Sequence, residues 1–133
     1  MANTRAYHPI GDELLVAVFN SFPKKRPLRF KDESYIMRAF YKASRKSKYS
    51  SLFRNYYFDN DGITPYSREI AEGINILHQT SMLGKMNPSF SSHIISIGVE
   101  IRYKRFIEPK LSESQKKILG ELSKEIKSSL ISK

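Results

Sequence analysis

The chain has 133 residues and a formal net charge of +10, from 23 Lys and Arg against 13 Asp and Glu. Apolar residues make up 40% and aromatic residues 12%, so the charge belongs to a folded domain rather than to a disordered basic tail. Without cysteine there are no disulfides, thiolate metal sites or Cys nucleophile, and the longest apolar run, Leu14 to Phe19, is too short to span a membrane. We therefore expect one cytoplasmic domain over residues 1–133 with an anionic partner and no membrane contact.

Two helices are predicted in the first part of the chain. Apolar residues between Leu14 and Phe22 recur on one helical face, with Asp12 as the cap and Pro23 as the end of the helix. A basic loop over 24–29 precedes a second helix over 33–47, whose apolar face is expected to dock on the core. The outward face of this second helix carries Arg38, Lys42 and Arg45.

An aromatic strand and a third helix come next. Residues 52–58 predict a short strand or an extended segment, which ends in a turn over 59–62. Either Thr64, followed by Pro65, or Ser67 is expected to cap the third helix. Gly73 lies beside the apolar stripe of this helix, where the missing side chain allows another helix to approach closely.

The last third of the chain predicts a hairpin and a helix. Residues 82–86 indicate a strand, and apolar and polar residues alternate from Ile95 to Tyr103, a period of two that is typical of a half-buried strand. Ser112 and Gln115 predict a capping box at the start of a helix over 112–131. Its narrow seam either packs on its own domain or forms a homodimer contact. The seam consists of Leu119, Leu122, Ile126 and Leu130.

The order of these elements predicts an α+β fold, a winged helix-turn-helix domain with an added C-terminal helix. In such a domain the third helix lies in a DNA groove, while the hairpin, or wing, and the preceding basic helix contact phosphates. This order therefore points to regulation of transcription through DNA.

Residues 53–83 carry a more specific pattern. Tyr56-Tyr57-Phe58 leads through a turn at Gly62 to Pro65-Tyr66-Ser67, a helix with Ile70, Ile74 and Leu77, and a closing Met82-Leu83. This stretch, about a quarter of the chain, resembles the Panacea antitoxin-domain group of small winged-helix proteins. Ile63 and Thr64 separate Gly62 from Pro65, which are usually adjacent in that group. The resemblance implies a regulatory or toxin–antitoxin-linked domain with a toxin as a candidate partner, and not an enzyme.

Residues 24–54 carry the main functional signal, eleven bases against two acids and a net charge of +9. Clustered Lys and Arg bind a polyanion by releasing its counterions, so we predict binding of duplex DNA largely through phosphate contacts. The alternative is a solvated basic surface. The candidate nucleic-acid-binding residues are Lys24, Lys25, Arg26, Arg29, Arg38, Lys42, Arg45, Lys46, Lys48, Arg68, Asn75, Gln79, Arg102 and Lys104.

The third helix separates two functional hypotheses. Asn75 and Gln79 have side chains that can pair with adenine, which supports DNA reading. Glu69 and Glu72 on the same helix would repel phosphates. These acids favour the rival hypothesis, a protein-interaction module of antitoxin type that does not bind DNA.

The remaining motifs do not indicate a catalytic or metal site. The aromatic residues at 53 and 56–58, next to Arg54, either stack bases of a single strand or pack in the core. The turn over 59–62 lacks the carboxylates of a calcium loop. His8, His78 and His93 have neither metal-ligand nor catalytic spacing. We therefore expect a non-enzymatic protein without a metal or a cofactor.

Overall fold

The computed structural model describes residues 7–22, 28–29, 33–59, 65–80, 82–85 and 92–131. Within these residues the α-helices are α1 (Glu13–Phe19), α2 (Glu33–Ser44), α3 (Arg68–Gln79), α4 (Ile97–Arg102) and α5 (Glu113–Ile131). Three short helical turns accompany them: η1 (Ser47–Tyr49), η2 (Tyr103–Ile107) and η3 (Glu108–Lys110). Turn η2 is π-helical and continues α4 without a break.

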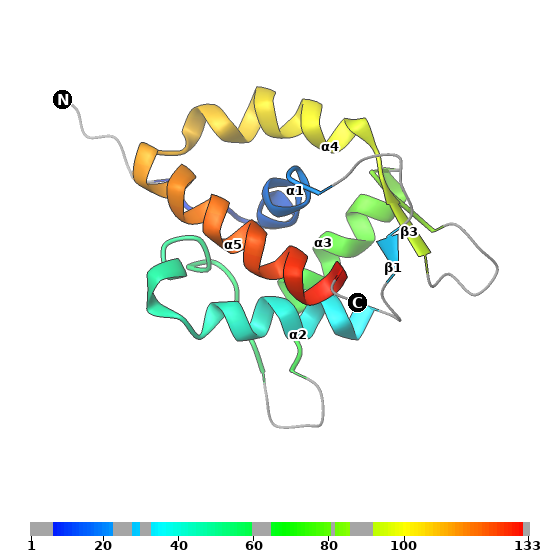
Figure 1. Cartoon of the computed structure of the whole chain (residues 1–133), viewed down its shortest axis with the longest axis horizontal. Coiled ribbons are helices and arrows are strands. Elements are labelled where there is room, and N and C mark those ends of the chain that lie inside the picture. The colour runs from blue at the N-terminus through cyan, green and yellow to red at the C-terminus, as the bar shows by residue number, and fades with distance from the viewer. Residues whose placement is uncertain are drawn as a thin grey trace.

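Helix α1 lies at the centre of the molecule (Figure 1). Helix α4 with η2 lies on the opposite side of α1 from α2, and α5 crosses in front of α1. Contacts with α3, α4, η2 and α5 surround α1, so every residue from Leu14 to Phe19 is buried, at 4% exposure or less. The sequence predicted a single apolar face for this helix, whereas the packing of its neighbours buries all its faces.

The segment after α2 consists of turns and is not an extended strand. Helix α2 ends at Ser44, three residues earlier than predicted, and η1 follows it. The predicted strand over 52–58 is wrong, since the chain turns there and inserts Leu52, Phe53 and Tyr56 into the core. Phe53 packs edge-on against Phe40 of α2, with ring centroids 6.3 Å apart. The aromatic residues of this segment therefore reach the core from turns. A segment rich in aromatic residues does not have to be a strand in order to bury them.

Helix α3 is capped by Ser67, one of the two caps predicted from the sequence. Ser67 is its N-cap, and the hydroxyl of Ser67 accepts a hydrogen bond from the amide of Ile70 at 3.3 Å. The predicted close approach at Gly73 is also confirmed. A Cβ at position 73 would lie 3.2 Å from Cα of Asp12 and 2.5 Å from Cδ1 of Leu15, so α3 rests directly on the start of α1.

Residues 95–103 differ most from the prediction made from the sequence. Strand β3 (Ser92–Ile95) ends where a long strand was predicted to begin, and Ser96 caps α4 by accepting a hydrogen bond from the amide of Gly98. Ile95, Val99 and Tyr103 are buried, whereas Ile97 and Ile101 are 50% and 53% exposed. Alternating apolar residues also contain a set spaced four apart, and the tertiary structure buries that helical set.

The winged-helix assignment and the α+β class are consequently wrong. Strands β1 (Leu28–Arg29), β2 (Leu83–Lys85) and β3 form a small antiparallel sheet in the order β1-β3-β2, with Leu28 opposite His93 and Leu83 opposite Ile95. These strands are only two to four residues long, because the residues expected to extend the wing form α4 instead. The described chain is mostly helical.

The start of α5 confirms the predicted capping box. The amide of Gln115 donates to the hydroxyl of Ser112 at 3.1 Å, and the amide of Ser112 donates to Oε1 of Gln115 at 3.0 Å. The four seam residues of this helix are at most 5% exposed, so the seam packs on its own domain and is not available to a second chain. Those residues are Leu119, Leu122, Ile126 and Leu130.

Candidate nucleic-acid interface

The outer face of α2 gathers three of the predicted binding residues. Arg38 and Lys42 are exposed, and so is Arg45, which directly follows the helix. Their spacing of four and three places them on one face, opposite the buried side of the helix at Ile36 and Phe40. Among the described residues, no carboxylate lies within ion-pair distance of these three cations. We call Arg38, Lys42 and Arg45 the α2 basic face.

Tyrosines are interleaved with this basic face. The guanidinium of Arg38 lies 5.9 Å from the ring centroid of Tyr35, and that of Arg45 lies 5.7 Å from the ring of Tyr41. Arg45 also donates a hydrogen bond to the hydroxyl of Tyr41 at 2.9 Å. These contacts hold both arginines close to the helix while their charge remains exposed, because a ring face attracts a cation without neutralising it.

A groove adjoins the end of the α2 basic face. It has a volume of about 470 Å³, and Tyr41, Arg45 and Tyr57 contribute to its walls. Phe53 and Tyr56 also contact the groove but are buried, whereas Tyr57 is 81% exposed. Of the aromatic residues for which base stacking and core packing were alternatives, two are thus core residues and Tyr57 has an accessible ring.

Two of the predicted binding lysines instead have acidic partners on α5. Nζ of Lys46 lies 2.9 Å from Glu125, and Nζ of Lys48 lies 3.3 Å from Glu121. The hydroxyl of Tyr49 donates to Glu125 as well, at 2.9 Å. Burial alone would raise the pKa of Glu125, but the hydrogen bonds from Lys46 and Tyr49 and the nearby positive charges lower this pKa. Lys46 and Lys48 therefore join η1 to α5.

Arg102 belongs to α4 and Lys104 to η2, the segment on the far side of α1 from α2 (Figure 1). The guanidinium of Arg102 donates to both carboxylate oxygens of Asp12, and the bond from Nη2 to Oδ1 is 2.9 Å long. The side chain of Asp12 is 9% exposed and that of Arg102 27%. Lys104 pairs with Glu100 at 3.3 Å on the surface. The structure thus separates these two residues from the α2 basic face.

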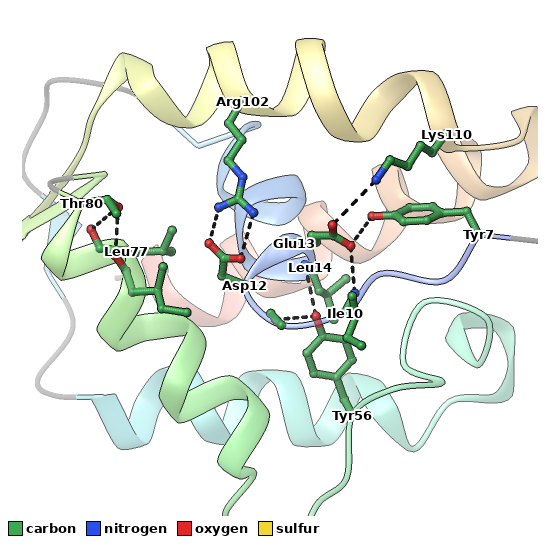
Figure 2. A network of polar contacts seen from close by, with 12 residues as sticks. Tyr7, Ile10, Asp12, Glu13, Leu14, Tyr56, Leu77, Thr80, Arg102 and Lys110 are labelled. Carbon is green, nitrogen blue, oxygen red and sulfur yellow. Dashed lines mark hydrogen bonds and ion pairs between the residues drawn. The ribbon is translucent and has the colours of Figure 1, made fainter.

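The start of α1 holds a polar network that the sequence analysis missed (Figure 2). Glu13 accepts hydrogen bonds from the hydroxyl of Tyr7 at 2.7 Å and the amide of Ile10 at 3.0 Å, and Lys110 approaches it at 4.0 Å. Burial and the bond to Glu13 raise the pKa of Tyr7. The hydroxyl of Tyr56 donates to the carbonyl of Gly11 at 2.6 Å. Figure 2 shows these side chains converging on α1 from both sides.

Asp12 belongs to this network rather than to a helix cap. It occupies the N-cap position of α1 but makes no side-chain capping bond, because Arg102 takes both of its oxygens. Gly11, with φ of +64°, turns the chain into the helix in a conformation that favours glycine. The only sequence signal was an acid at a helix start, since its partner lies 90 residues away.

Helix α3 presents a mixed outer surface. Arg68, Asn75 and Gln79 are exposed as predicted, and Glu72 is exposed among them. Glu69 accepts hydrogen bonds from the amide of Tyr57 and the hydroxyl of Ser67, both at 3.1 Å. Burial raises the pKa of Glu69, but these bonds and the charge of Arg68 outweigh it and lower the pKa. The helix therefore keeps carboxylates where a DNA-reading helix would meet phosphates.

The structure does not describe every predicted binding residue. Lys24, Lys25 and Arg26 are outside the described residues, as is the side chain of Arg29, whose backbone belongs to β1. Within the described ranges, no cluster of His, Asp and Glu has the geometry of a metal site, and no helix combines the length and apolar character needed to cross a bilayer. Comparisons with family models, curated proteins and solved structures found no match to the chain.

Proposed function

We propose that this is a non-catalytic, cytoplasmic protein that binds nucleic acid, with duplex DNA as the expected form, through phosphate contacts from the α2 basic face. The observation that carries the proposal is the contrast between two groups of cations. Lys46, Lys48 and Arg102 have carboxylate partners in the fold, whereas Arg38, Lys42 and Arg45 share one exposed face with none among the described residues. Cations that are grouped and have no carboxylate partner contribute most to the affinity for a polyanion.

The geometry favours contact with the backbone over reading of bases. The three cations extend along one face of a helix, which suits a row of phosphates, and the neighbouring Tyr35 and Tyr41 keep the two guanidinium groups close to the surface. Helix α3, with Glu72 exposed beside Asn75 and Gln79, offers a poorer surface for a duplex groove. The proposed binding therefore has a large sequence-independent component.

Salt dependence tests the proposal directly. The affinity for a fluorescently labelled duplex, measured by anisotropy, should fall linearly on a logarithmic plot as salt rises. Each phosphate contact contributes about 0.9 to the slope, so R38Q/K42Q/R45Q should lower the slope by about 2.7. Absence of duplex binding even at low salt would refute the proposal, and an unchanged slope in this variant would remove the α2 basic face from it.

A matched control removes the same charge elsewhere. Lys104, Arg105 and Lys110 lie on the segment on the other side of α1, and K104Q/R105Q/K110Q loses three positive charges as well. Its slope should change by less than about 1, because loss of general charge attraction removes no phosphate contact. A similar loss of slope in both variants would indicate that total charge, and not the α2 basic face, determines binding.

Protein binding is the second candidate function, and one surface favours it. Ile97, Ile101 and Phe106 are 50%, 53% and 57% exposed on α4 and η2. Phe106 lies in the π-helical turn η2, which directly continues the helix that carries the two isoleucines. Exposed apolar residues grouped on neighbouring turns are typical of protein contacts. This candidate replaces the first if the protein binds no duplex at low salt.

A further inference from the structure

A second groove lies between the end of α1, η2 and α5, and its lining carries an excess of positive charge. It has a volume of about 360 Å³, and Lys116, Lys124 and Lys127 line it together with polar and apolar residues but no acid. Within the described residues, one of these lysines has an ion pair: Lys116 lies 3.5 Å from Glu113, whose side chain is 92% exposed. A salt bridge so exposed to water neutralises little charge, so the groove attracts anions.

Two buried hydroxyl-bearing residues form part of the same wall. Ser123 is 4% exposed and Tyr103 is 8% exposed, and both line the groove. Neither hydroxyl has a hydrogen bond to another described residue. Both hydroxyls are therefore available to donate hydrogen bonds to a molecule in the groove. Burial and the charge of Glu108 raise the pKa of Tyr103, which keeps its hydroxyl protonated and able to donate.

Gly120 gives the groove its opening. It lies in the interior of the 19-residue helix α5, where glycine is less favourable than alanine. A Cβ built at this position meets no atom within 4 Å, so packing within the described chain does not require a glycine there. This differs from Gly73, whose missing side chain is needed by α1. The space above Gly120 is part of the groove and is open to a ligand.

We infer that this groove binds a small phosphomonoester. Three lysines around a small volume suit the double negative charge of a phosphate group, which lysine binds as a point charge. The hydroxyls of Ser123 and Tyr103 are donors suited to the phosphate oxygens. Ala17 and Leu119 supply an apolar wall for the organic part of the ligand, and the volume is at the lower end for small-molecule pockets. The inference is independent of the function proposed for α2.

The test uses phenyl phosphate as the probe and phenol as its uncharged match. Titration of the ¹⁵N-labelled full chain should give saturable amide shifts centred on Gly120 and Ser123, with a Kd of about 1 mM or tighter. K124Q/K127Q should weaken binding at least tenfold. Lys117 is exposed on the same helix but does not line the groove, so K117Q should bind within about twofold of the native chain.

A further variant separates space from charge. G120L keeps every lysine, and its side chain extends into the open space without displacing any described atom at Cβ. It should abolish the shifts while thermal unfolding shows an intact fold. R38Q/K42Q/R45Q should retain phenyl phosphate binding, so this site and the α2 basic face can fail separately. Phenol binding as well as phenyl phosphate, absence of saturable shifts, or native affinity in K124Q/K127Q would overturn the inference.

Discussion

The Asp12–Arg102 pair should be the most valuable single charge interaction for stability. The substitution R102M removes the guanidinium but keeps the aliphatic length of the side chain. Asp12 then retains a carboxylate that is 9% exposed, next to the close contact between α1 and α3. Breaking a buried pair by removing one partner costs about 3–5 kcal/mol, and partial exposure of Arg102 favours the lower value, about 3 kcal/mol.

This loss is large relative to the total free energy of unfolding. A domain of this size is typically stable by about 5–15 kcal/mol, so R102M should move the urea midpoint far below that of the native chain. In D12N/R102M the charge is absent and the shape is nearly kept, so part of the stability should return. The double-mutant cycle, followed by circular dichroism, should then give a coupling free energy of at least about 1.5 kcal/mol.

The neighbouring surface pair is the control. Lys104 and Glu100 are 63% and 37% exposed, so K104M should change the free energy of unfolding by about 0.5 kcal/mol or less. If R102M also costs less than about 1 kcal/mol, the pair behaves as a surface salt bridge. That result would refute the argument that burial makes the orphaned carboxylate expensive.

Two further predictions concern glycines and pH. G73A should destabilise the fold by about 1–3 kcal/mol, because its Cβ would press on Leu15 and on the backbone of Asp12, whereas G120A should stabilise it by about 1 kcal/mol. Urea midpoints measure both, and equal signs for the two substitutions would contradict the packing argument. The lowered pKa of Glu125 contributes stability that is present above the unfolded pKa of about 4.3 and is lost as pH falls through the folded pKa. The free energy of unfolding of the native chain should therefore fall below about pH 5, and that of E125Q should fall less over the same range. Identical pH profiles for the two proteins would show that the contacts of Glu125 with Lys46 and Tyr49 do not contribute to stability.

Local signals in the sequence were sufficient for several elements. The cap at Ser67 and the capping box of Ser112 and Gln115 place the starts of α3 and α5, since a capping bond joins residues three apart. The helical spacing of Arg38, Lys42 and Arg45 likewise predicts their common exposed face, because the buried apolar residues of α2 determine which side faces outward.

Residues 95–103 show where local pattern failed. Ile95, Ile97, Val99, Ile101 and Tyr103 satisfy a strand period of two, but every second member of the set satisfies a helical spacing of four. The buried surface offered by α1 matches the helical set, so Val99 and Tyr103 are buried and Ile101 remains exposed. The wing failed as a prediction for this reason, and the aromatic strand over 52–58 failed because turns bury its rings equally well.

The sequence by itself determined the composition of the basic region, the caps of α3 and α5 and the face on which the α2 cations lie, because these depend on residues a few positions apart. The tertiary structure alone decided which cations have partners. Lys46 meets Glu125 and Arg102 meets Asp12 across long stretches of chain. The groove beside Gly120 also depends on the packing of α1, η2 and α5. An electrostatic contact depends on distance in space, and only the packing of helices around α1 determines that distance.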